Sequence, residues 1–351
     1  MTLALNRQSI AVRNLYAEIA EAATVVDVLL AAGPGKGSLK ERSLKGGVYL
    51  YWQFRDLAGR VRQHYLGPDD RTTRARATAL EANRRQLDEA QDHLQQLASA
   101  FVAAGGMRHP PVHFKVIEAL AMGGIFYKGG VLVGAHAFIA IGNMLGYSWH
   151  GATATEDIDF ARSDAIEVAV NPEVKLDVPS VLDALKMGFF LVSELDVRKP
   201  STSLQTNRQR VKVDFLTPIP RSGKTDPVQF TDLGIAAQPL PFMDYLLGGG
   251  TQRGFVIGPY ALPVLLPQPG RLALHKLVVA EERVAAMAAK SDKDRRQAAQ
   301  LILALAESLP GALRSAARDA PPRVRSRVKR SVALIRRLSE DAASALDAAL
   351  R

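Results

Sequence analysis

Two spacings of apolar side chains divide this chain into expected helices and strands. Helical spacing, or a run of helix-forming residues, predicts helices at residues 7–32, 72–103, 112–121, 135–145 and 179–187. Alternating or short apolar runs predict strands at residues 47–54, 60–66, 131–133, 156–160, 165–170, 209–216, 254–257 and 260–266. After residue 269 only helical patterns occur, with expected helices at residues 270–288, from Lys290 onwards, and at 321–339.

Glycine and proline clusters mark the boundaries between these groups of elements. They lie at residues 105–111 and 267–269, on either side of the apolar strands. We therefore predict an α/β (α+β) fold in three regions: an N-terminal helical region with a small antiparallel sheet, a mixed-sheet core, and an all-helical region, at residues 1–108, 109–269 and 270–351. Residues 217–240, rich in Pro, Gly and Thr, are expected to form an irregular connection inside the core.

Three aspartates occupy similar positions on two of the expected strands. Asp157 and Asp159 are two residues apart, so a strand presents both carboxylates on one face while Ile158 and Phe160 point into the core. Asp214 is the acidic residue of the later alternating strand. Neighbouring carboxylates repel one another unless a cation lies between them, and hard divalent cations prefer oxygen ligands. The pattern therefore predicts a site for Mg²⁺ or Mn²⁺ that also binds substrate phosphates.

Composition and charge narrow the possible partners. The 351-residue chain has 47% hydrophobic and 23% charged residues, as expected of a soluble globular protein, and no apolar run approaches the roughly 20 residues that span a bilayer. A net charge of +10 favours polyanionic partners such as nucleotides, RNA or DNA. The chain has no cysteine, and its first seven residues lack the pattern of a signal peptide. We expect a cytoplasmic protein that does not enter a membrane.

A glycine turn, a helix, an Asp-x-Asp strand and a later single-Asp strand follow one another in the core. This order resembles the DNA polymerase β-like nucleotidyltransferase superfamily over residues 125–220, with the turn at Gly134-Ala135. Further along, the chain is similar to the helical K…R…KD motif of the bacterial AbiEii/MenT-type toxin nucleotidyltransferases through Lys276, Arg283, Lys293 and Asp294. The resemblance implies a nucleotidyltransferase-fold core.

The resemblance also implies roles for individual residues. The catalytic and metal-binding residues would be Asp157, Asp159 and Asp214, and the nucleotide would be bound by Gly134, Ala135, His136, Lys276, Lys293 and Asp294. Two departures concern the triphosphate. The superfamily usually has Gly-Ser or Gly-Gly at the turn, whereas this chain has Gly134-Ala135, so the serine hydroxyl that would hold a phosphate is missing. The interval between the turn and the first aspartate is also longer than in the common pattern.

The reaction implied by the resemblance is metal-dependent transfer of a nucleoside monophosphate from an NTP to a hydroxyl, with release of pyrophosphate. RNA, and first of all the 3′ end of tRNA, is the expected acceptor, and a protein hydroxyl is the alternative. Two other interpretations stay open: a catalytically degenerate protein that binds nucleic acid, and a toxin that pairs with an antitoxin protein. The basic helix at residues 321–339, which carries no acid, would face RNA or solvent.

The small N-terminal sheet allows two interpretations. Its aromatic side chains alternate along residues 47–66 with basic ones, including Arg55, Arg60, Arg62 and His64, as in surfaces that stack on single-stranded nucleic acid. The same aromatic side chains can instead form one hydrophobic face packed on helices. We favour packing for this sheet.

Overall fold

A computed structural model describes most of the chain. The described residues are 3, 5–32, 36–44, 46–55, 61–149, 153, 155–162, 176–193, 196, 198–208, 210–283 and 287–351. The expected strand at 165–170 lies outside them. The chain forms two compact units, one of residues 1–10, 105–258 and 262–351 and the other of residues 11–104 and 259–261. Both helices and a mixed sheet are present, which confirms the predicted fold class.

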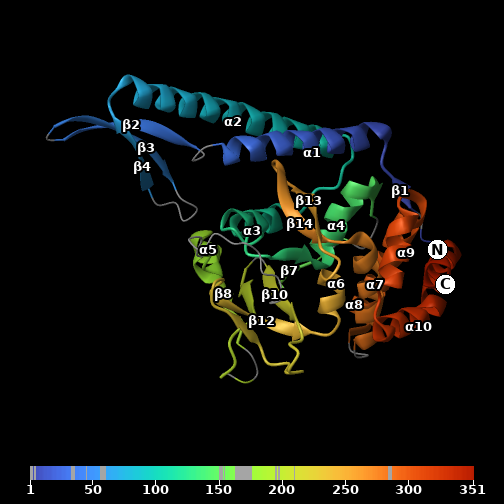
Figure 1. Ribbon diagram of the computed structural model, residues 1–351. Helices are drawn as coiled ribbons and strands as arrows, with labels where there is room; N and C mark the ends of the chain where they lie inside the picture. Colours follow the sequence, from blue (N-terminus) through green and yellow to red (C-terminus); the bar gives the residue numbers. More distant parts are fainter. Residues whose placement is uncertain are drawn as a thin grey trace. The chain divides into compact units, whose positions relative to one another are not determined.

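A seven-stranded mixed sheet is the centre of the larger unit (Figure 1). Its main path runs β11-β12-β10-β7-β5, and β9 pairs with both β8 and β10. The central pairs β7–β10 and β10–β12 are parallel, whereas β5 pairs with β7 in the antiparallel direction. The strands are β5 (Val131–Val133), β7 (Asp157–Ala161), β8 (Phe189–Leu191), β9 (Ser203–Thr206), β10 (Lys212–Pro218), β11 (Val228–Phe230) and β12 (Ile235–Leu240).

Apolar side chains on the inner face of this sheet form the core. Ile158 and Val213 are fully buried at paired positions, and the rings of Phe160 and Phe215 stack with their centroids 6.0 Å apart. Each of these residues alternates with a polar one along its strand, as the sequence predicts. The polar face of β7 and β10 is thereby set by the two-residue period of the strands.

Helices account for the rest of the larger unit, together with two short strand pairs. The expected helices of the core and of the C-terminal region are present, although the one predicted to reach residue 288 ends at Glu282. The helices are α3 (Pro111–Met122), α4 (Gly134–Leu145), α5 (Val178–Ala184), α6 (Met243–Leu247), α7 (Pro269–Glu282), α8 (Ala288–Ser308), α9 (Pro310–Arg318), α10 (Pro322–Leu338) and α11 (Glu340–Leu350). The strand pairs are β1 (Asn6–Arg7) with β6 (Tyr147–Ser148), and β13 (Thr251–Ile257) with β14 (Ala261–Pro267). Among the described residues, no helix is both long and apolar enough to cross a bilayer.

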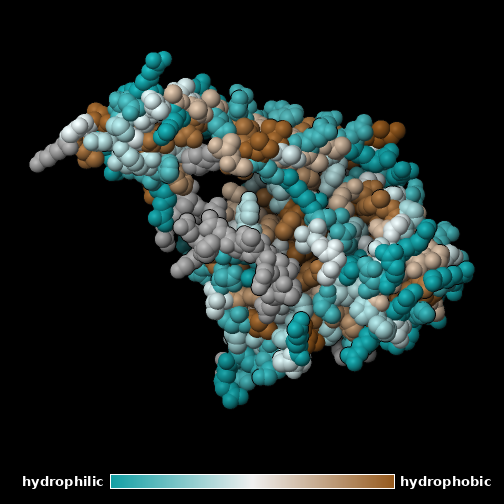
Figure 2. Space-filling model, in the orientation of Figure 1, coloured by the Kyte–Doolittle hydropathy of each residue, from teal (hydrophilic) through white to brown (hydrophobic). Residues whose placement is uncertain are grey.

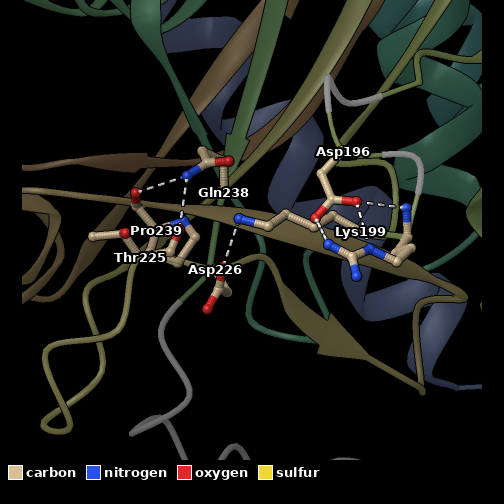
Figure 3. Close-up of polar contacts among 7 residues, drawn as sticks. Asp196, Lys199, Thr225, Asp226, Gln238 and Pro239 are labelled. Carbon is tan, nitrogen blue, oxygen red and sulfur yellow. Dashed lines mark hydrogen bonds and ion pairs between the residues drawn. The ribbon is translucent and has the colours of Figure 1, made fainter.

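The expected irregular connection at residues 217–240 is wrong in part, because β11 and β12 lie within it. Polar contacts hold the segment before these strands (Figure 3). The Lys199 ammonium lies 2.7 Å from a carboxylate oxygen of Asp226, and the Gln238 side-chain amide donates to the Thr225 carbonyl oxygen at 3.3 Å. Proline and glycine around these strands concealed their short alternating pattern in the sequence.

Two long helices make up most of the smaller unit. α1 (Ile10–Ala31) and α2 (Arg71–Ala103) lie side by side (Figure 1), and their antiparallel pairing brings the Tyr16 and Phe101 rings to 6.0 Å. Their buried residues recur every seven positions, as in a coiled coil, at Val12, Ile19 and Val26 of α1 and at Leu87, Leu94 and Phe101 of α2.

The small sheet of this unit has three strands, one more than predicted. β3 (Gly47–Arg55) pairs with β4 (Val61–Pro68) as expected, and β2 (Gly37–Leu44) adds to the other edge of β3. Most residues of β2 are polar and exposed, so the strand shows little of the apolar alternation that identifies a strand. Figure 2 shows mainly hydrophilic and intermediate residues on the visible surface of this sheet.

Candidate active site

The parallel pairing of β7 and β10 brings the three predicted aspartates to one face of the sheet. Asp159 is directly opposite Asp214, and Asp157 is two residues before Asp159 on the same face. Because the strands are paired residue for residue, the alternation that buries Ile158 and Val213 turns all three carboxylates the other way. The sequence placed the aspartates on two strands, and the register makes these strands direct neighbours.

Gly134 gives the Asp159 carboxylate its space. β5 ends at Val133, which pairs with Asp159, and α4 begins at Gly134 with φ of +67°. A Cβ atom at this position would lie 2.0 Å from Asp159 Oδ2, so only glycine allows this approach and this backbone conformation. Ala135 follows as a buried residue on the first turn of α4. The glycine of the predicted turn therefore contacts the aspartate strand, and the role of Ala135 toward a nucleotide stays a prediction.

The surroundings of Asp159 disfavour the ionised form of its carboxyl group. Burial raises its carboxyl pKa, and the charges of Asp214 and Asp157 raise it further, to about 7. The Lys276 ammonium acts in the opposite direction but does not restore an ordinary value. A buried carboxyl whose ionisation is disfavoured by two neighbouring carboxylates is a chemical environment suited to a hard divalent cation. No grouping of three potential ligand side chains at metal-binding distances is found among the described residues.

Two polar side chains already contact Asp214. Ser203 of β9, directly opposite it in register, donates a hydrogen bond from Oγ to Asp214 Oδ1 at 2.6 Å. The Lys212 ammonium lies 2.6 Å from the same oxygen, because Lys212 and Asp214 share one face of β10. Lys212 is also opposite Asp157 in register. The Lys212 ammonium, a cation of the protein itself, therefore lies among the three site carboxylates.

A second ionic cluster joins α7 to α8. The Lys276 ammonium lies 3.2 Å from Asp294 Oδ1, and the Arg283 guanidinium 2.8 Å from Asp294 Oδ2. Lys276 and Asp294 are only 5% and 8% exposed. Burial and then the charge of Lys276 lower the pKa of the neighbouring Lys293. The residues of the K…R…KD motif are therefore brought together in space, and Lys276 and Asp294 are close enough to the aspartate strands to affect Asp159 electrostatically.

A cleft of about 600 Å³ opens beside Asp157. Three cationic side chains line it, from α8 and from the residues before α3: Lys290, Lys293 and Arg108. Lys290 Nζ lies 3.5 Å from Asp157 Oδ2. The hydroxyl-bearing Thr153 and Thr155, which the sequence places in a loop over the site, also line this cleft. Glu156 and Asp157 also line the cleft, opposite in charge to its three cations. Its size and these cations suit a polyphosphate next to the carboxylates.

His136 is placed differently from what a phosphate ligand requires. Its side chain has no exposed surface, and its Nε2 lies 3.0 Å from Nδ1 of His113. Burial and the neighbouring His109 and His113 hold the pKa of His136 well below its ordinary value, so the ring is neutral. The structure therefore does not bring His136 into the cleft. Helix α4 is apolar and packs its first turn inwards, so the position of His136 just after the glycine turn does not place it near a phosphate, as the sequence had suggested.

Some residues of the site carried a weak signal or none. Lys212 was detectable, because a strand that turns Asp214 toward the site turns the residue two positions earlier the same way. Ser203 depends on the pairing of β9 with β10, and Arg108 on the position of the chain before α3. Neither relation appears in local sequence patterns.

Comparison with known proteins agrees with this geometry. The strand order and the shared carboxylate face define a nucleotidyltransferase-like core. Residues 112–322 match the family described as Nucleotidyltransferase, and this is more than half of the chain, so the protein belongs to that family and is a transferase. Members generally use an NTP and a divalent metal. No curated protein and no solved structure matches the chain. The narrower AbiEii/MenT-type branch stays a prediction.

Proposed function

We propose that the protein transfers a nucleoside monophosphate from an NTP to a hydroxyl of RNA and releases pyrophosphate. The observation that supports this most strongly is the shared face of β7 and β10, where Asp157, Asp159 and Asp214 lie beside the cation-lined cleft. These carboxylates fit Mg²⁺ or Mn²⁺ by their oxygen chemistry and by the raised pKa of Asp159. A bound divalent cation would activate the attacking hydroxyl and neutralise the triphosphate.

The protein's own residues have separable tasks in this proposal. Lys290, Lys293 and Arg108 would bind the triphosphate in the cleft, and Gly134 would keep the space that Asp159 needs. Lys276 and Asp294 would hold α7 and α8 together so that these cations face the carboxylates. The net charge of +10 favours RNA as the acceptor, with the tRNA 3′ end first and a protein hydroxyl second. The AbiEii/MenT-type resemblance adds a toxin role with an antitoxin partner.

A labelling experiment tests the reaction. The full chain is incubated with each α-labelled NTP and Mg²⁺, together with total cellular RNA or protein, next to Asp159→Asn and the exposed-site control Asp341→Asn. We expect label on RNA with the wild type and the control, and at least a roughly hundredfold lower yield with Asp159→Asn, because a catalytic carboxylate is lost. Label confined to protein would replace RNA as the acceptor.

One observation favours the catalytically degenerate alternative. The Lys212 ammonium contacts Asp214, where a second cation of a nucleotidyltransferase would otherwise be bound. If no nucleotide labels any acceptor with Mg²⁺ or Mn²⁺, this internal ion pair has replaced the metal and the protein acts by binding alone. Transfer that Lys212→Met increases would show instead that the lysine only competes with the cation.

A further inference from the structure

The β2–β3–β4 sheet of the smaller unit has two chemically different faces. On the face toward the helices, Leu50 and Trp52 of β3 are fully buried. Arg62 and His64 of β4 are paired with Phe54 and Trp52, so they belong to this face by register. The packing predicted for the aromatic side chains therefore holds for Trp52, but it does not hold for the tyrosines of the same strands.

Three tyrosines lie together on the opposite face. Tyr51 and Tyr65 are directly paired, and their ring centroids are 5.3 Å apart. The Tyr49 ring is 6.3 Å from that of Tyr65, which is 50% exposed. Tyr49 and Tyr51 are half-buried, so part of each ring faces solvent, and its burial against a partner would be favourable. This tyrosine face offers π surfaces at a spacing suited to stacking.

Cations flank the tyrosine face along β2. Lys40 is paired with Tyr51, and Arg42 with Tyr49. The Arg42 guanidinium lies 5.3 Å from the centroid of the Tyr51 ring, an arrangement in which arginine and aromatic ring attract one another. Among the described residues of these strands, none that the register places on this face is acidic. The face is therefore positive as well as aromatic.

A third row of this face is polar and neutral. Ser38, Gln53 and Gln63 are paired across the three strands, and the Gln63 amide donates to the Gln53 side-chain oxygen at 3.0 Å. Such groups can exchange hydrogen bonds with sugar hydroxyls. Rings, cations and neutral hydrogen-bonding groups follow one another across a surface that carries no negative charge among its described residues, which complements a nucleic acid strand and not an apolar protein segment.

We propose that the tyrosine face, comprising Lys40, Arg42, Tyr49, Tyr51 and Tyr65, binds single-stranded RNA. Bases would stack on Tyr51 and Tyr65, and Lys40 and Arg42 would contact the phosphates. The choice of RNA over DNA rests on the polar row and on the RNA acceptor of the proposed function. The binding surface itself is independent of the transfer reaction, since it lies in the other unit of the chain.

Binding to a fluorescein-labelled single-stranded RNA of about 20 nucleotides tests the surface, with the full chain and fluorescence anisotropy. We expect Tyr51→Ala and Tyr65→Ala each to weaken binding about tenfold, from the loss of one stacked base. Tyr51→Phe should stay within about twofold of wild type, because it keeps the ring. Tyr127→Ala, a control tyrosine that is 76% exposed in the larger unit, should bind like wild type. Circular dichroism verifies that each variant is folded.

Charge and ligand type provide the second arm. Arg42→Gln and Lys40→Gln should each reduce the slope of log affinity against log salt by about one. Equal loss in Tyr127→Ala and Tyr51→Ala, or unchanged affinity in Tyr51→Ala, overturns the proposal. If duplex RNA binds as tightly as the single-stranded RNA, bases do not stack on the tyrosines. If single-stranded DNA binds as tightly as the single-stranded RNA, the surface is not specific for RNA. RNA binding that depends on Tyr51 without nucleotide transfer would refute the proposed function and support this surface.

Discussion

Replacing Asp159 with asparagine should stabilise the cation-free protein, and more strongly at about pH 8 than at about pH 5. Burial and the charges of Asp214 and Asp157 raise the pKa of Asp159 to about 7 in the folded chain, whereas an unfolded aspartate titrates near 3.8. Between these values the folded state holds a proton that the unfolded state has lost, so stability falls as the pH rises through this window. Above a pH of about 7 the folded protein bears the full cost of ionising Asp159.

The size of this effect follows from the two pKa values. Each pH unit between them corresponds to about 1.4 kcal/mol. The raised pKa therefore costs the folded state at most about 4 kcal/mol at about pH 8, where Asp159 is ionised, and about 1.5 kcal/mol at about pH 5, where the folded state keeps Asp159 protonated. The asparagine side chain that replaces it is neutral and has nearly the same shape. We therefore expect Asp159→Asn to gain at least about 1 kcal/mol more at the higher pH than at the lower one.

Urea unfolding in EDTA at both pH values measures this difference. Asp196→Asn is the control. The side-chain hydrogen bond from Arg198 lowers the pKa of Asp196, so this carboxylate is ionised at both pH values and the substitution should change the stability equally at both. Added Mg²⁺ should stabilise the wild type and leave Asp159→Asn almost unchanged. A gain of equal size at both pH values, or no gain at all, would show that burial and the neighbouring carboxylates do not raise the pKa of Asp159.

Three further substitutions test the surroundings of the aspartates. Gly134→Ala should destabilise by about 2–4 kcal/mol through left-handed strain and overlap with the carboxylate, whereas Gly188→Ala, with φ of +71° and open space, should show only about 1 kcal/mol of strain in the same urea experiment. Lys276→Met should cost about 2–4 kcal/mol of unfolding free energy because it leaves the buried Asp294 with one cation fewer, and a loss below about 0.5 kcal/mol would contradict its structural role. Lys212→Met should tighten Mn²⁺ binding about fivefold in calorimetry, because it removes a competing positive charge, and weaker binding would show that the lysine supports the metal site.

The sequence predicted the parts of this site that depend on local periodicity. Alternation along β7 and β10 placed Asp157, Asp159 and Asp214 on the polar faces of their strands, and Gly134, the first residue of α4, indicated a turn. Which strands pair is a long-range property, and it decides that Asp159 meets Asp214 and that Gly134 touches the carboxylate. No local pattern contains that information.

Two misjudged segments have physical reasons of the same kind. The strand β2 has polar residues on both faces and only Leu39 and Leu44 as large apolar ones, so its formation depends on pairing with β3 and not on its own apolar pattern. His136 was expected near a phosphate because it follows the glycine turn, but helix α4 is apolar nearly all round and buries its first turn. In both places the conformation or burial of the segment is decided by the elements that pack against it and not by its local sequence.

The residue-for-residue pairing of β7 with β10 also limits how this gene can change its length. A single residue inserted between Lys212 and Asp214 would turn one of them into the apolar core and the other out of it. The last residues of β2, by contrast, are exposed, so an added residue at the turn that follows them changes no buried side chain of that strand. We therefore expect insertions and deletions among natural or selected variants to collect at such turns, and the strands of the aspartates to vary only by substitution.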